Sequence, residues 1–523
     1  MELTLFRLFF CIILGLVPLH PSIANSMIEL SKGVYFEEIV IRTSDGVSFV
    51  IETQPYHLPR SEKVEKIIAD FSAKHHLSMV THELEFPDYL GNQVPFKKFS
   101  IAPIYNLYDA KSLSMQLLEM GIQVKEILKC SKCKSDKNQL ISVVKIDPNL
   151  FRGKVISSLA TQSISGLATV SEISESNNSL VSVNGNFFVM HSKLGLPGDI
   201  SGIAVENGKL LSEAVNNRPA LIIDNKGKIK ANIVHSTNTK IVLRKGNEEL
   251  AINGLNRLPN KILNCGNLHN GEFQFPTHDV VCTNNNEIIA FTKEFGSLNL
   301  LDEIEAELYI FNDTNSSLSK VSGYPKMLKD DETLILATGS TKGKLDAFIN
   351  SIKGEAVSVS YQVYADGKEI SLREGLFIIG GGPTLLLNSQ IPLADWYKQG
   401  WHISSHKSAI EGQDTTDFES DETLDRSSFY ESWVYGEHPR TSVGVDAKGN
   451  MYIFAVYGRN PYLSQGMSLP ELADFMKSKG VVDAINLDGG GSTAMVVNGR
   501  LTGIPSDNRG EREVADALSI ILD

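Results

Sequence analysis

The stretch Asn486–Thr493 places an acidic residue beside the most flexible kind of backbone. It reads NLDGGGST, so the carboxylate of Asp488 precedes three glycines, Gly489, Gly490 and Gly491, and two hydroxyl residues. Glycine admits positive φ and close approach of a ligand to the backbone, and the N–H groups of such a turn can hold an anion. A carboxylate there suits a ligand with an anionic part and a separate reacting part, such as a sugar phosphodiester. The alternative is a tight hairpin turn with a structural Asp.

The elements that must position this motif are clearly delimited. The runs TSVGV and MYIFAVY, joined by DAKGN, predict a hairpin over 441–457. A helix is expected over 468–480, with Ser468 as its cap, Glu471 completing a capping box and Gly480 ending it. The run VVDAINL then predicts a strand that ends at Asp488, where the glycines turn the chain.

Length, charge and the first residues indicate the class of protein. The chain has 523 residues, 42% of them hydrophobic, which suggests a globular protein of two or three domains. Its net charge of -13 argues against a nucleic-acid partner. Residues 1–24 combine Arg7, an apolar run and small residues, which predicts a secretory signal peptide; an N-terminal anchor helix is the alternative. With no later apolar segment long enough to span a membrane, we expect a secreted or periplasmic protein.

The cysteines left after signal removal are Cys130, Cys133, Cys265 and Cys282. An even number in an exported chain favours two disulfides. Pairing Cys130 with Cys133 and Cys265 with Cys282 is the simplest of three connectivities. Because CSKC lacks a second pair at metal-ligand spacing, we predict no metal site. The glycine turn also lacks the lysine of a nucleotide-binding loop, and no cofactor is predicted.

Residues 30–135 predict a small α+β module. Two strands are expected around the SDG turn within 33–57, and helices are expected to be capped by Ser61 and Asp109, each between strands. Two strand–helix–strand units form a ferredoxin-like arrangement. With the layout of NLYDAKSLSMQLLEMGIQVKEI, the module resembles a SPOR domain, which implies peptidoglycan as a partner; a structural or prodomain role is the alternative.

Residues 140–523 are rich in strands and turns and carry several motifs besides NLDGGGST. These include VSVNGNFFVM (181–190), GLPGDISGIAVENGKL (195–210), HPRTSVGVDAKGN (438–450) and EREVADALSI (511–520). In this set and order the motifs resemble the phosphodiester glycosidase family, with Asn186 where the family usually has glycine. The resemblance implies a hydrolase of sugar-1-phosphodiesters with a strand-rich mixed α/β catalytic domain, hence an α+β protein overall. With the predicted signal peptide and the SPOR-like module, the expected substrate belongs to an envelope or extracellular glycan.

The chemistry of such a bond can be assigned to residues. Phosphate departs as a stable anion, so its protonation matters less than in an ordinary glycoside. One carboxylate, assigned to Asp488, then suffices as nucleophile or to direct water onto the anomeric carbon. We assign neutralisation of the departing phosphate to Arg440, whose guanidinium can bind two oxygens, and consider Arg512 second; a structural ion pair is the alternative for either. A second carboxylate stays open among Asp199, Glu437, Asp507 and Glu511.

Substrate binding is assigned to residues of the same motifs, namely Asn184, Asn186, Asn486, Gly489, Gly490, Gly491, Ser492, Thr493 and Arg512. For the asparagines, the alternative is hydrogen bonding within turns. Two other functions remain open: a catalytically inactive glycan-binding or peptidoglycan-binding envelope protein with the same fold, and a metal-dependent phosphodiesterase that cuts the other side of the phosphate. Binding without turnover, or loss of activity to a chelator, would distinguish them.

Overall fold

The computed structural model describes residues 27–522 except 43–46, 59, 89, 131–136, 266–275, 352–355 and 404–429. The predicted signal peptide and Cys133 lie outside the described residues. Within these ranges, no helix combines the length and apolar character needed to cross a membrane.

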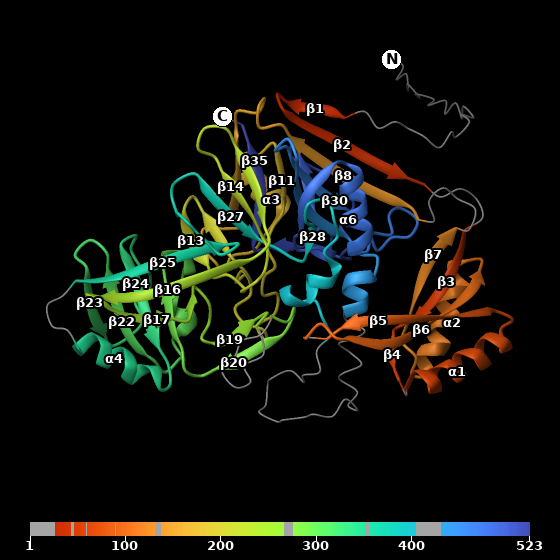
Figure 1. The fold of residues 1–523 in the computed structure, drawn as a ribbon, viewed down its shortest axis with the longest axis horizontal. Coiled ribbons are helices and arrows are strands. Elements are labelled where there is room, and N and C mark those ends of the chain that lie inside the picture. The colour runs from red at the N-terminus through yellow and green to blue at the C-terminus, as the bar shows by residue number, and fades with distance from the viewer. Residues whose placement is uncertain are drawn as a thin grey trace, which may run out of the picture.

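The protein is strand-rich α+β, and its largest sheet carries the hairpin and strand predicted around Asp488 (Figure 1). This seven-stranded sheet has the order β1 (Ile28–Ser31), β2 (Val34–Ile41), β8 (Gln139–Ile146), β30 (Met451–Val456), β29 (Arg440–Asp446), β31 (Val481–Asn486) and β28 (Thr384–Leu386). The helix α6 (Leu469–Ser478) has the expected capping box of Ser468 and Glu471. It covers one face of the sheet, where Leu472 and Met476 pack against Phe454 and Ala484.

The other face of this sheet packs against a five-stranded sheet. Its order is β33 (Arg500–Leu501), β32 (Met495–Val497), β11 (Val181–Asn184), β35 (Asp516–Ile521) and β9 (Lys154–Leu159). Ile453 and Ile485 of the large sheet share one core with Val183 and Leu518 of the smaller sheet. Because neighbouring residues of a strand point to opposite faces, Ile453 and Phe454 enter two different cores.

Three further sheets and several short elements complete the part after residue 150. One sheet has the order β13 (Lys209–Ser212), β12 (Ala204–Glu206), β27 (Leu376–Gly380), β14 (Ala220–Asp224), β15 (Lys230–Val234). The second has β17 (Glu248–Ile252), β16 (Thr237–Lys245), β25 (Val357–Ala365), β26 (Lys368–Ile370), and the third has β18 (Gly254–Leu255), β21 (Ile288–Phe291), β24 (Glu332–Ala337), β22 (Glu307–Asn312), β23 (Ser317–Val321). This part also contains the pairs β19 (Asn260–Leu263) with β20 (Val281–Asn284) and β10 (Ala168–Thr169) with β34 (Glu513–Val514), and the helices α3 (Val170–Ser176) and α4 (Thr341–Ser351).

The N-terminal module contains the two predicted strand–helix–strand units. They are β3 (Val47–Thr53), α1 (Arg60–Lys74) and β5 (Ser78–Pro87), then β6 (Gln93–Ile104), α2 (Leu107–Glu119) and β7 (Val124–Cys130), with β4 (Tyr56–His57) between β3 and α1. The main sheet order is β4, β6, β3, β7, and β5 also pairs with β6. Both helices pack on one face of this sheet through a core that includes Ile68, Phe99 and Leu117.

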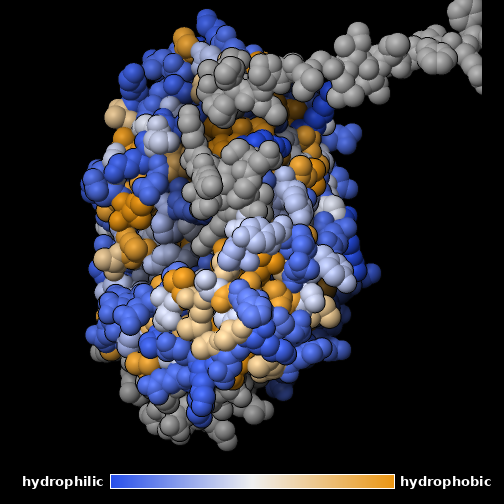
Figure 2. Space-filling model, turned by 90° about the vertical axis from the view of Figure 1, so that its right-hand side faces the viewer, coloured by the Kyte–Doolittle hydropathy of each residue, from blue (hydrophilic) through white to orange (hydrophobic). Residues whose placement is uncertain are grey.

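The module is attached to the rest of the protein by apolar and charged contacts. Phe86 and Phe96 of its sheet belong to the core that contains Tyr430, and Lys98 forms ion pairs with Glu52 at 2.9 Å and Glu431 at 3.0 Å. Figure 2, which views the molecule from this side, shows a mostly hydrophilic surface with apolar residues interspersed.

Three local predictions for the module are wrong. The strand Val34–Ile41 pairs with β8 along its whole length, from Val34 with Ile146 to Ile41 with Gln139, and not with β3. It belongs to the large sheet and not to the module predicted over 30–135, because alternation identifies a strand without specifying its partner. Asn106, not Asp109, caps α2, and its side chain accepts a hydrogen bond from the Asp109 N–H. Ser61 lies inside α1, which begins at Arg60.

Candidate functional site

A cavity of about 280 Å³ lies where one end of the large sheet meets the β19–β20 hairpin. Three arginines, two carboxylates and two histidines line it, together with the glycine turn, aromatic side chains and amides. These residues are Arg440, Arg459, Arg512, Asp488, Asp279, His278, His438, Gly489, Gly490, Gly491, Phe187, Phe188, Met190, Leu263, Asn264, Ser432, Trp433 and Asn486. With more arginines than carboxylates, the cavity attracts an anion.

Asp488 is half-buried and its backbone is held on both sides. Its N–H donates to the carbonyl of Gly185 at 3.1 Å, and its carbonyl accepts from Nδ2 of Asn184 at 2.7 Å. Burial is the main cause that raises the pKa of the Asp488 carboxyl to about 6, and hydrogen bonds from Ser492 and the Gly489 N–H oppose it. The group is therefore ionised at neutral pH and close to the pH range in which it exchanges a proton.

Arg440 opens β29 and is 3% exposed. Its Nε donates to the carbonyl of Met467 at 2.9 Å, and its Nη2 donates to those of Trp433 at 2.6 Å and Gly436 at 3.0 Å. Burial lowers the pKa of Arg440 to about 9, so the guanidinium is still cationic at neutral pH. Among the described residues its hydrogen-bond partners are carbonyls and not a carboxylate, which leaves its positive charge to act on the cavity.

The glycines make room for arginine side chains. A Cβ atom on Gly491 would lie 2.1 Å from Nη2 of Arg512 and 2.3 Å from Oδ1 of Asp507. A Cβ atom on Gly490, whose φ is 60°, would lie 2.9 Å from Nη2 of Arg459. Asp507 pairs with Arg512 at 2.8 Å and with Arg459 at 3.7 Å, so it holds both guanidinium groups beside the turn.

The same turn offers fewer free donors than the sequence suggests. The N–H of Gly489 donates to the carboxylate of Asp488 at 2.8 Å, and the N–H of Gly490 donates to the carbonyl of Pro439 at 2.8 Å. Two of the three N–H groups expected to hold an anion are therefore occupied. The three arginines are therefore the charged donors that the cavity offers an anionic ligand.

Arg459, which the sequence analysis missed, reaches the site through the register of the β29–β30 hairpin. Arg440 at the start of β29 pairs with Val456 at the end of β30. Arg459 follows three residues later and therefore lies at the same end of the sheet as Arg440 and Asp488. The predicted hairpin contained this signal, because its register alone brings Arg440 and Arg459 to one end.

The three asparagines expected to bind substrate have different places. Asn486 lines the cavity, and its buried Oδ1 has no hydrogen-bond partner among the described residues. Asn184 lies behind the residues that line the cavity. Its Oδ1 accepts a hydrogen bond from Thr441 at 2.6 Å, and its Nδ2 donates one to the backbone carbonyl of Asp488. Asn186 is farther away and donates to Asp516 at 2.6 Å while it accepts from the Gly380 N–H.

The two hydroxyl residues that follow the glycines also lie behind the residues that line the cavity. Ser492 and Thr493 are each 1% exposed and neither lines the cavity. Ser492 contacts the cavity residues Asp488 and Arg512 by hydrogen bonding. Thr493 accepts from Thr441 at 3.4 Å, so both hydroxyls support residues of the wall.

None of the four carboxylates considered as a second acid lines this cavity. Asp199 faces a neighbouring cavity, Glu437 pairs with Lys137 at 3.0 Å, and Glu511 binds the N–H and hydroxyl of Ser171. Asp507 positions the two arginines. Asp279, which we did not consider from the sequence, is the carboxylate that lines the cavity with Asp488 in the described part of the chain.

An aromatic cluster that the sequence did not reveal reaches the cavity through His278 and Trp433. His278 lies 5.0 Å from Trp401 in a stacked arrangement and 4.7 Å from Trp433 in an edge contact. Burial is the main cause that lowers the pKa of His278 to about 4, so its ring is neutral. Neutral aromatic rings beside a charged wall suit a ligand that has an apolar face and an anionic end.

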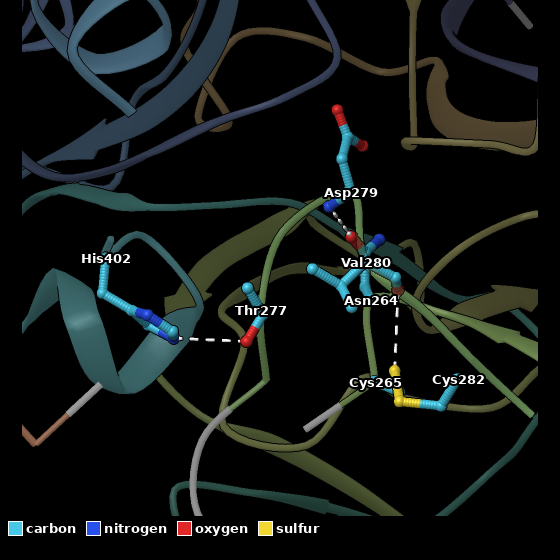
Figure 3. The surroundings of a disulfide bond; sticks show 7 residues. All are labelled: Asn264, Cys265, Thr277, Asp279, Val280, Cys282 and His402. Atoms are coloured by element: carbon cyan, nitrogen blue, oxygen red, sulfur yellow. Dashed lines mark hydrogen bonds between the residues drawn. A yellow bond between two sulfur atoms is a disulfide. The ribbon is translucent and has the colours of Figure 1, made fainter. Parts of the chain in front are cut away.

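The predicted disulfide between Cys265 and Cys282 is confirmed and lies beside the β19–β20 hairpin (Figure 3). Its Cα atoms are 5.9 Å apart, in the usual range. The predicted pairing of Cys130 with Cys133 involves Cys133, which lies outside the described part of the chain.

Comparisons with known proteins find similarity in the C-terminal part of the chain. A family model described as phosphodiester glycosidase matches residues 312–521, which contain Arg440 and Asp488. The mouse and human proteins named N-acetylglucosamine-1-phosphodiester alpha-N-acetylglucosaminidase are each 42% identical over 90 residues, which is 17% of this chain and 17% of theirs. The chain thus matches about a sixth of the length of these curated relatives.

The fold is similar to that of a solved bacterial structure over almost the whole chain. A crystal structure of an exported-protein candidate from Burkholderia pseudomallei has a TM-score of 0.74 and 24% sequence identity. The match covers 95% of this chain and 96% of the Burkholderia chain, so the similarity extends into the N-terminal module. The predicted likeness of that module to a SPOR domain finds no support. The family match, which includes β29, β31 and the glycine turn, shows that residues 312–521 of this chain are similar to the phosphodiester glycosidase family.

Proposed function

We propose that this protein is an exported glycosidase that hydrolyses the bond between a sugar anomeric carbon and a phosphodiester. The observation that supports this most is the meeting of Asp488 and Arg440 in one cavity with Arg459 and Arg512. The family match adds the reaction class. The disulfide Cys265–Cys282 favours an extracytoplasmic location, because such bonds persist in oxidising compartments.

In this proposal the phosphate lies against the three arginines and the sugar lies toward Trp433 and Asn486. The guanidinium groups neutralise the charge that grows on phosphate as the bond to the anomeric carbon breaks. The ionised carboxylate of Asp488 acts on the positive charge that develops at that carbon. The unpartnered Oδ1 of Asn486 accepts a hydrogen bond from a sugar hydroxyl.

The test is a panel of sugar-1-phosphodiesters that differ in sugar and in the group beyond the phosphate. We expect release of free sugar and a phosphomonoester, which a reducing-sugar assay and phosphorus NMR detect. Addition of a chelator should not lower the rate. Release of sugar phosphate and free alcohol would place cleavage on the other side of the phosphate. That result, or binding of every glycan without turnover, would overturn the proposal.

Gly491→Ala should weaken substrate binding without unfolding the protein. The added methyl would lie 2.1 Å from Nη2 of Arg512 and must displace it from the cavity wall. We expect KM for the phosphodiester to rise about tenfold, equivalent to about 1.4 kcal/mol. Steady-state kinetics and a thermal melt measure the two effects.

The matched control is Gly343→Ala in α4, where an added Cβ would meet no atom within 4 Å. Alanine is the better helix former by about 1 kcal/mol, so this variant should keep its kinetics and lose no stability. An unchanged KM in Gly491→Ala would contradict the role given to Arg512.

A further inference from the structure

Asp279 is a carboxylate of the cavity that comes from outside the large sheet. Asp488, Arg440 and Arg459 all lie at strand ends of the seven-stranded sheet or just beyond them. Asp279 belongs instead to the segment that enters β20, in the separate two-stranded sheet β19–β20. The cavity therefore has one carboxylate from the end of the large sheet and one from the segment that enters β20.

The backbone around Asp279 is built to hold this residue in place. Its φ is 58°, in a region that residues other than glycine seldom adopt. Its N–H donates to Oδ1 of Asn264 at 2.7 Å, and Nδ2 of the buried Asn264 donates to Ser201 at 2.6 Å. The disulfide Cys265–Cys282 joins the two strands of this segment immediately beyond Asn264. The backbone of Asp279 is thus fixed in a left-handed conformation by its contact with the buried Asn264.

The side chain of Asp279 itself is left open to the cavity. Figure 3 shows its carboxylate turned away from the disulfide and from Asn264. The side chain is 54% exposed, and its one ion-pair contact among the described residues is with Nε2 of His278 at 3.8 Å, beyond hydrogen-bond distance. The neutral state of His278 makes this contact weaker still. A carboxylate held by its backbone but not by its side chain can accept a proton from a ligand.

We propose that Asp279 is a second catalytic carboxylate, which takes a proton from the water that attacks the anomeric carbon. This inference rests on the proposed function. The arginines place the phosphate on the large-sheet wall, so water must approach the carbon from the other side. Asp279 is the carboxylate that the hairpin wall supplies. Asp488, next to the arginines, then stabilises the positive charge on the sugar and forms no covalent bond with it.

The step balances as a single displacement. The water oxygen bonds to the anomeric carbon while one of its protons moves to Asp279. The bond from that carbon to the phosphate oxygen breaks, and its electron pair leaves with the phosphomonoester, whose charge the arginines neutralise. The configuration at the anomeric carbon is inverted, and Asp279 returns its proton to solvent.

The first experiment is Asp279→Asn, with Asp70→Asn on the exposed surface of α1 as the matched control. Asparagine tolerates positive φ, so the substitution removes the charge and keeps the backbone. We expect kcat to fall at least about a hundredfold with KM within about threefold of the wild type, and an unchanged Tm. The control should keep wild-type kinetics. Wild-type kcat in Asp279→Asn would overturn the inference.

Two further measurements separate proton abstraction from a structural role. Asp279→Gly also fits positive φ and leaves space for azide, which needs no base; azide should restore turnover and give an inverted glycosyl azide. Proton NMR of the first sugar released by the wild-type protein should show inversion. Retention, or no rescue by azide in a folded variant, would refute the role of Asp279. If the wild-type protein cleaves no sugar phosphodiester, the proposed function itself has failed.

Discussion

Asp488→Asn should abolish glycosyl phosphodiester hydrolysis while the protein stays folded. The variant keeps the shape of the side chain and an oxygen that can accept from the Gly489 N–H, now at 2.8 Å from the carboxylate. It removes the negative charge that acts on the anomeric carbon. We expect kcat/KM to fall at least about a thousandfold, which corresponds to about 4 kcal/mol in the barrier. Residual activity within tenfold of the wild type would exclude Asp488 as the essential carboxylate.

The same variant should be more stable than the wild type above pH 6. Because burial raises the pKa of Asp488 to about 6 in the folded protein, against about 3.9 in an unfolded chain, the folded state binds the proton more tightly. The stability that protonation of Asp488 contributes to the wild-type protein is therefore lost as pH rises from about 4 through 6. Asn has no such loss. Allowing for the partial exposure of the carboxylate, Asn should stabilise the fold by about 1 to 2 kcal/mol at pH 8.

Thermal melts of both proteins at pH 4 and pH 8 test this directly. The two Tm values should be similar at pH 4 and should diverge at pH 8, with the variant higher. In the wild type, kcat/KM should fall about tenfold per pH unit below pH 6, because the active form of Asp488 is ionised. A wild-type protein more stable than the variant at pH 8 would contradict the buried-charge argument.

Arg440→Lys should weaken recognition of the phosphate although it conserves charge. The guanidinium is fixed by the carbonyls of Met467, Trp433 and Gly436, and a lysine cannot reproduce this planar set of donors. We expect kcat/KM to fall about a hundredfold, about 2.7 kcal/mol. Inhibition by inorganic phosphate should weaken in parallel, which a purely structural role would not produce.

Arg373→Lys provides the control for the loss of a planar donor set. Arg373 binds both oxygens of Asp224, at 3.0 and 2.6 Å, and does not line the cavity. This variant should keep its kinetics and its inhibition by phosphate. If Arg440→Lys and Arg373→Lys bind phosphate equally well, Arg440 does not contact the phosphate.

The sequence predicted correctly what depends on neighbouring residues. The helix α6 has both members of its capping box, Ser468 and Glu471, and the hairpin β29–β30 follows from two apolar runs around a short turn. The strand β31 ends just before Asp488, as the glycines indicated. These features are local, because the groups that satisfy a helix end or a turn lie within a few residues of it.

Tertiary structure decided which of these local pieces meet. No pattern in the sequence connects Asp279 or Trp433 to Asp488, and none of the four carboxylates considered from the sequence lines the cavity. The strand Val34–Ile41 likewise joined the large sheet and not the module. Strand alternation and residue type specify which face is buried, but the partner of a strand or loop is set by the packing of whole sheets. The sequence thus determined the reactive turn, whereas the fold determined which residues lie opposite it.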